Sequence, residues 1–169
     1  MKKNKTILKR QILIHSSKQK VWDALADFGN VQDLSPNIAK SFLTSDVKNG
    51  VGATRHCDFT AMGASVEEKI VEWNEGRSVR IQIYEAKNLP MVRGMEALFE
   101  VMEQGDSTLL TGTFEYHMSH ALGDFLNNLQ MRKVNEKSWV RFIAGIKHHV
   151  ETEEKVDRNT KLDLSAVSA

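Results

Sequence analysis

The residue types that could do chemistry are concentrated between positions 53 and 70, a stretch that predicts a β-hairpin. With a four-residue loop at 60–63, antiparallel pairing sets Arg55 opposite Glu68 and Cys57 opposite Val66 on one face. The opposite face carries only polar pairs, namely Asp58 with Ser65, His56 with Glu67 and Thr54 with Lys69. A shift of one residue would mix the two faces, so the pattern favours this register.

Arg55 and Glu68 are therefore predicted to face each other on an otherwise apolar, inward surface. Buried charges are costly unless they are paired, and such a pair has three interpretations. The first is a structural ion pair that ties two strands. The second is a polar spot that orients a mostly apolar ligand in a cavity, and the third is an acid/base pair in catalysis. Nothing else in the sequence marks a second catalytic group, so catalysis has the least support.

The other reactive residue types favour structural interpretations. Cys57 is predicted to point inward, where a nucleophile would need a base or cation beside it. Arg55 is its neighbour on that face, but an inert buried thiol is favoured. The histidines do not have the spacing of a metal-binding helix motif, so we expect surface positions and no metal for His56, His117, His120, His148 and His149. The segment Gly50-Val51-Gly52 fits a tight turn between strands rather than a phosphate loop.

The elements that position this hairpin follow from periodicity and turn residues. The chain begins with a strand at 6–15 and two short helices; Ser16 and Gln19 form a capping-box pattern, and Gly29 and Pro36 end the two helices. Apolar alternation then predicts strands at 38–44, 53–59, 64–72, 78–86, 94–103 and 107–118. Their short connections favour antiparallel pairing.

A long helix is predicted over 120–155, with a bend or a change of packing partner near Asn135. Trp139, Phe142 and Ile146 lie on one stripe of it, as helix core or as an interface. Gly112 removes a side chain from the apolar face of the last strand, which marks a bend or leaves space. Residues 1–155 are expected to form one domain, and residues 156–169 a disordered tail.

Composition excludes several classes of protein. The chain has 169 residues, of which 41% are hydrophobic and 27% charged, with a net charge of +1. A dedicated nucleic-acid binder would carry a basic excess. The single cysteine excludes an intramolecular disulfide. No apolar run is long enough to span a membrane and no signal peptide is visible, so we expect a cytoplasmic protein without integral membrane association.

The order of these elements resembles the helix-grip arrangement of the START / birch-pollen-allergen-like (SRPBCC) superfamily, in its polyketide cyclase/dehydrase and lipid-transport branch. The resemblance covers about residues 7–150. The segments that carry it are Ile14-His15-Ser16-Ser17, Lys20-Val21-Trp22, Phe28-Gly29-Asn30, Leu34-Ser35-Pro36, Gly50-Val51-Gly52-Ala53-Thr54-Arg55, the run from Glu67 to Arg77, and Gly105-Asp106-Ser107-Thr108. Their order and spacing are specific for fold and poorly specific for function.

The resemblance implies an α+β fold in which a curved seven-stranded antiparallel sheet wraps around a long C-terminal helix, with two short helices after the first strand. It also implies a ligand cavity between sheet and helix. Carried over by position, the residues that approach this cavity are Phe28, Leu34, Arg55, Cys57, Phe59, Glu68, Ile81, Ile83, Phe99, Phe114, Tyr116, Leu126 and Leu129. Many relatives carry tryptophans near Leu34 and Gly112 that this chain lacks, which affects the size and shape of the cavity.

Three functions remain open from the sequence. The first is binding or transport of a small hydrophobic or amphipathic molecule such as a lipid, isoprenoid, quinone or aromatic polyketide, with Arg55 and Glu68 holding its polar end and Tyr116 as a possible hydroxyl donor. The second is a polyketide cyclase, aromatase or dehydratase that uses the same cavity, with Arg55 and Glu68 as candidate catalytic residues. The third is a protein-interaction module with a vestigial pocket. No cofactor and no nucleic acid are expected, and the chain is expected to be a monomer or homodimer.

Overall fold

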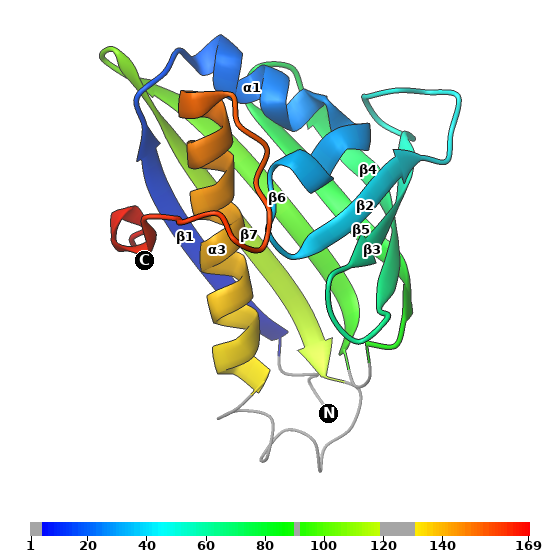
Figure 1. Cartoon of the computed structure of the whole chain (residues 1–169). Coiled ribbons are helices and arrows are strands. Elements are labelled where there is room, and N and C mark those ends of the chain that lie inside the picture. Colours follow the sequence, from blue (N-terminus) through cyan, green and yellow to red (C-terminus); the bar gives the residue numbers. More distant parts are fainter. Residues whose placement is uncertain (1–4, 90–91, 119–130) are drawn as a thin grey trace.

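A curved, seven-stranded antiparallel sheet forms one layer of the molecule (Figure 1). The computed structural model describes residues 5–89, 92–118 and 131–169. The strands are β1 (Lys5–Ile14), β2 (Ile38–Leu43), β3 (Thr54–Phe59), β4 (Ser65–Asn74), β5 (Ser78–Lys87), β6 (Val92–Gln104) and β7 (Ser107–Met118). Their order is β1-β7-β6-β5-β4-β3-β2, so the first strand lies beside the last. This confirms the predicted sheet.

The second layer consists of helices that cover the concave face of the sheet. They are α1 (Lys18–Ala26), the 3-10 helix η1 (Phe28–Asp33) and the long helix α3 (Met131–Thr152), which crosses the sheet diagonally (Figure 1). The helix ends at Thr152, where Glu153 takes a φ of 63°. The predicted start of this helix at residue 120, together with Leu126, Leu129 and His120, lies outside the described residues.

The capping of α1 differs from the sequence prediction by one residue. Ser17, not Ser16, is the N-cap, and its side chain accepts a hydrogen bond from the Lys20 backbone N–H at 3.3 Å. Ser16 lies in the bend just after β1 instead. Its backbone N–H donates to the Ile14 carbonyl at 2.9 Å, and its own carbonyl accepts from the Thr108 hydroxyl at 2.9 Å.

The core lies between the concave face of the sheet and the helices. Ile12, Ile70 and Leu110 from the sheet, Trp22 from α1 and Ile143 from α3 are among its fully buried side chains. Burial of such side chains contributes roughly 1.5–3 kcal/mol each. The apolar faces of the strands and of α3 therefore form one continuous cluster.

Helix α3 approaches η1 closely because residue 145 is glycine. A Cβ at Gly145 would lie 2.2 Å from the backbone oxygen of Leu34 and 3.5 Å from the Val156 side chain.

A single carboxylate connects α1 to the sheet. Glu75 accepts hydrogen bonds from the indole N–H groups of Trp22 and Trp73, at 2.8 and 2.6 Å.

The segment after α3 returns across the helix toward β1 (Figure 1). Val156 is 4% exposed and its N–H donates to the Asp33 carbonyl at 3.1 Å. Further on, η2 (Leu164–Ala166) precedes a two-way backbone pairing in which Ser168 and Gln11 exchange hydrogen bonds at 2.9 Å. Residues 156–169, for which the sequence predicts a disordered tail, thus have contacts near both ends of the segment.

Candidate functional site

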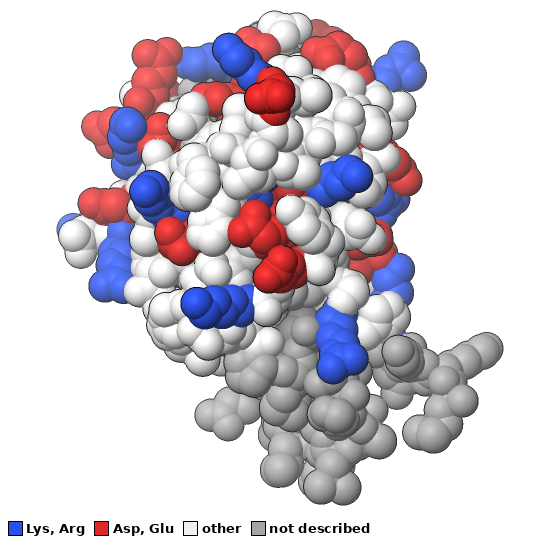
Figure 2. All heavy atoms as spheres, turned by 90° about the vertical axis from the view of Figure 1, so that its right-hand side faces the viewer, with Lys and Arg blue, Asp and Glu red and all other residues white. Residues whose placement is uncertain are grey.

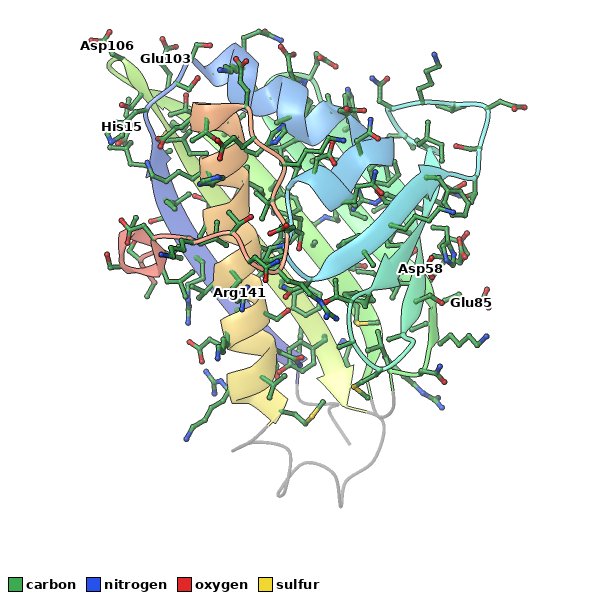
Figure 3. All side chains as sticks on the ribbon, viewed as in Figure 1. His15, Asp58, Glu85, Glu103, Asp106 and Arg141 are labelled. Carbon is green, nitrogen blue, oxygen red and sulfur yellow. The ribbon has the colours of Figure 1, made fainter. Side chains whose placement is uncertain are left out.

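The hairpin of β3 and β4 has the predicted register. Arg55 pairs with Glu68, Cys57 with Val66 and His56 with Glu67. Arg55 and Cys57 are buried at 5% and 1% exposure, on the side that faces the helices. The opposite side is polar: Asp58 of β3 and Glu85 of β5 point away from the helices (Figure 3).

The inward face carries an ion pair between the Arg55 Nε and the Glu68 Oε2. The two side chains are only 6% and 14% exposed. Isolated charges at this depth would be strongly destabilising, whereas a paired guanidinium and carboxylate satisfy each other. The predicted opposition of a cation and a carboxylate inside the fold is therefore what the structure shows.

Arg55 is also held by η1. Its Nη1 donates a hydrogen bond to the Phe28 carbonyl at 2.8 Å, and its guanidinium carbon lies 4.1 Å from the centroid of the Phe28 ring. A guanidinium stacked on an aromatic face is further stabilised by the cation–π interaction. Phe28 thus approaches the site through its carbonyl and its ring together. The carbonyl contact has no signal in the sequence.

Cys57 is a buried, free thiol beside Glu68. Its Sγ lies 3.7 Å from the Glu68 Oε2. Burial raises the pKa of the thiol far above its usual range, and the Glu68 charge raises it further, while Arg55 opposes the shift. A thiol that keeps its proton is a poor nucleophile. This supports the buried, unreactive interpretation of Cys57.

The apolar residues expected around the ligand lie on the inward face in two adjoining clusters. Phe28, Leu34, Ile81, Phe99 and Tyr116 are buried in the larger one, while Cys57 belongs to the smaller. Other members of the set retain partial exposure; they are Phe59, Ile83 and Phe114. Ile83 contacts both clusters. Most of the predicted set thus shares one side of the sheet, and Leu126 and Leu129 fall outside the described residues.

Two aromatic residues of α3 join this surface without having been predicted for it. Trp139 stacks on Phe114, with ring centroids 5.4 Å apart, and Phe142 packs edge-to-face on Phe99 at 5.7 Å. Phe142, like Ile83, contacts both clusters. Their spacing along the helix predicted that they share an apolar stripe, but it did not predict which part of the sheet they contact.

Gly112 makes room for the Trp139 indole. A Cβ at Gly112 would lie 2.4 Å from the Ile143 Cδ1 and 2.9 Å from the Trp139 Cζ2. The indole N–H donates to the Gly112 carbonyl at 3.3 Å. The helix therefore supplies an aromatic ring over this strand position, near which the resemblance led us to expect a tryptophan. The sequence predicted that Gly112 either marks a bend or leaves space, and the structure shows that it leaves space.

The histidine of the hairpin points away from this surface. His56 lies between two carboxylates on the outer face, with Nδ1 bonded to Glu67 and Nε2 to Asp58 at 3.0 Å. Within residues 5–89, 92–118 and 131–169, no three His, Cys, Asp or Glu residues are placed to hold a metal ion. Lys, Arg, Asp and Glu are interspersed on the face over the β2 edge (Figure 2).

A separate hollow of about 240 Å³ lies where α1 and η1 meet the end of α3. Leu34 is the only predicted ligand residue in its lining, which also includes Asp23, Asp27 and His149. Lys20 and Glu153 form an ion pair of 2.9 Å beside it. Charged and apolar residues line this hollow together, and it does not contain the Arg55–Glu68 pair. No helix in the described part of the chain is long and apolar enough to cross a membrane.

Comparison with known proteins places the fold and the family. Residues 5–151 match the family described as polyketide cyclase / dehydrase and lipid transport. No curated protein matches the chain by sequence.

Three solved structures are similar to the chain. The Zhui aromatase/cyclase from Streptomyces sp. R1128 has a TM-score of 0.75 at 14% identity, covering 88% of this chain and 94% of that one. TTHA0849 from Thermus thermophilus has a TM-score of 0.72 at 14% identity, covering 86% and 97%. Ginseng major latex-like protein 151 from Panax ginseng has a TM-score of 0.67 at 18% identity, covering 89% and 97%. They share the helix-grip fold with this chain.

Proposed function

We propose, because this chain belongs to the polyketide cyclase/dehydrase and lipid transport family, that it binds a small hydrophobic or amphipathic molecule between the concave face of the sheet and α3. The observation that carries the proposal is the Arg55–Glu68 pair, set among apolar side chains that retain partial exposure. Apolar walls with a few convergent polar groups are the usual composition of small-molecule sites. Lipids, isoprenoids, quinones and aromatic polyketides all fit this description.

The apolar body of the ligand would contact Phe59, Ile83, Phe114 and Phe142. Removing apolar surface from water contributes about 25 cal/mol per Å², and part of this gain offsets the ordering of the ligand. The ion pair would then orient the polar end. Phe142 and Trp139 are added to the set of ligand residues that the sequence predicts.

The first test is native mass spectrometry of the purified protein, followed by denaturing extraction of any bound molecule. We expect a stoichiometric small apolar adduct, or a mass shift when lipids, quinones and polycyclic aromatics are added. A matched pair of variants locates the site. Ile83→Trp fills the inward face and is expected to abolish the adduct, whereas Tyr84→Trp, at the exposed neighbouring position, is expected to retain it. A clean apo mass with every added compound would contradict the proposal and favour an interaction module.

The second candidate function is an enzyme of the cyclase, aromatase or dehydratase type, which the family description favours. The Arg55–Glu68 ion pair favours binding over acid/base catalysis, because each charged group already has a partner of opposite charge. An Arg55→Ala variant that still binds a substrate but loses turnover would support the enzyme. Equal loss of binding and turnover would support the carrier.

The compartment and the assembly state remain predictions. We propose a cytoplasmic monomer or homodimer. Size-exclusion chromatography with light scattering measures the assembly state directly.

A further inference from the structure

The two charged groups of the inward pair differ in what they leave free. Arg55 is held from three directions: Nε bonds to Glu68, Nη1 donates to the Phe28 carbonyl at 2.8 Å, and the Phe28 ring covers one face of the guanidinium at 4.1 Å. Its side chain is 6% exposed. The guanidinium is therefore fixed in position, and little of it is exposed to a ligand.

Glu68 is the more accessible partner, at 14% exposure. Both contacts that reach it from Arg55 and Cys57 go to the same oxygen, Oε2. Within the described part of the chain, no hydrogen-bond donor reaches the other oxygen, Oε1. Glu68 lies opposite Ile83 in the sheet register, next to the apolar surface assigned to the ligand. The polar spot therefore presents a hydrogen-bond acceptor.

We infer that the site selects an uncharged hydroxyl group, of an alcohol or phenol, on an apolar body, and that Glu68 Oε1 accepts its hydrogen bond. This inference rests on the proposed function. An ionised carboxylate at the same place has no proton to donate to Oε1, and the negative charge of Glu68 would repel it, so the site disfavours it. Arg55 then acts as a positioning residue: it holds Glu68 in place, and it balances the charge so that the ligand need not.

The test measures binding to the purified full-length protein by isothermal titration calorimetry at pH 7.5. Two series of compounds share a body and differ only in the polar end: dodecan-1-ol, dodecyl methyl ether and dodecanoate; and 2-naphthol, 2-methoxynaphthalene and 2-naphthoate. In the series whose body binds to the site, we expect the hydroxyl compound to bind at least tenfold more tightly than its methyl ether. The ether keeps the body and the neutrality but cannot donate, so this comparison isolates the hydrogen bond.

The carboxylates test the charge balance, in comparison with Glu68→Gln. This variant keeps an oxygen acceptor, but it removes the negative charge of residue 68 and leaves the Arg55 charge unpaired. The ratio of hydroxyl to carboxylate affinity is expected to fall at least tenfold in it. A plain desolvation preference of an apolar cavity would leave the ratio unchanged. The control is Glu67→Gln, the next residue, which bonds to His56 on the outer face; we expect it to keep the wild-type ratio within about twofold.

The outcomes separate the inference from the proposed function. Binding of hydroxyl compound and ether with equal affinity, or tighter binding of the carboxylate by the wild type, overturns the inference while leaving the proposed function intact. Failure of all six compounds to bind the folded wild-type protein counts against both. If Glu68→Gln does not fold, the comparison of hydroxyl and ether in the wild type still decides.

Discussion

At the scale of single residues, the hairpin separates two kinds of ionisable group by the face on which they lie. Arg55 and Glu68 point inward, where burial makes pairing obligatory. His56 points outward between Glu67 and Asp58 and is partly exposed. The adjacent residues Arg55 and His56 of β3 therefore have different environments: in the proposed function the inward pair offers a polar contact to a ligand, and the outward group responds to pH.

The pKa of His56 is expected to lie above its ordinary value of 6.5, because Glu67 and, to a lesser extent, Asp58 bond to its ring nitrogens. A raised pKa in the folded state means that the protonated ring stabilises the fold. This contribution is complete below about pH 6.5 and is lost as the pH rises through the folded value. NMR titration of the His56 ring measures the shift directly.

The matched variant for this titration is Glu67→Gln, which removes the carboxylate with the largest effect. The pKa of His56 should then move back toward 6.5. A wild-type value at or below 6.5 would show that the two hydrogen bonds do not persist in solution.

At the scale of elements, the sequence predicted what depends on alternation and turns. The register of β3 and β4 followed from the separation of polar and apolar residues, and the range of β7 agreed at both ends. What could not be predicted were contacts between elements. The Phe28 carbonyl that accepts from Arg55 and the Trp139 ring over Gly112 depend on how η1 and α3 lie on the sheet. Periodicity shows which face of an element is buried, but it does not show which other element packs against that face.

The close approach of α3 to η1 makes Gly145 the position of the helix least tolerant of a side chain. Gly145→Ala would place a Cβ 2.2 Å from the Leu34 backbone oxygen, so one of the two elements must shift. We expect the free energy of unfolding to fall by roughly 1–3 kcal/mol, despite the gain of about 1 kcal/mol in helix propensity. Urea denaturation measures this change.

Val134→Ala is the control on the same helix, since Val134 is 56% exposed. Its effect should stay within about 0.5 kcal/mol. A Gly145→Ala protein as stable as the wild type would mean that α3 does not need this close approach.

At the scale of the whole molecule, the last residues connect distant parts of the chain. Gln11 and Ser168 are 157 residues apart in sequence and adjacent in space. A polar segment with few apolar residues predicts a tail when it is considered alone, because its partner cannot be recognised locally. Val156 and Val167, which pack on the interior, are too few to form a periodic signal.

Removing residues 164–169 is expected to destabilise the protein. The truncation deletes the two backbone hydrogen bonds to Gln11 and the contacts of Ala166 and Val167 with the core. We estimate a loss of about 2 kcal/mol, or a Tm lower by about 4–8 °C, as measured by calorimetry. Ser168→Ala is the control, because it keeps the backbone pairing and should melt close to the wild type. An unchanged Tm after truncation would show that the segment is not bound.

The placement of β1 also has a consequence for the order of events during synthesis. β1 is the first strand to leave the ribosome, but its partner in the sheet, β7, begins at Ser107, and Ser168 pairs with its other edge. The sequential hairpins from β2 to β6 can pair as they emerge, whereas β1 must wait until β7 has emerged. Since long-range pairings slow folding, the incorporation of the first strand is a late step, and until then its apolar side chains need protection from other chains.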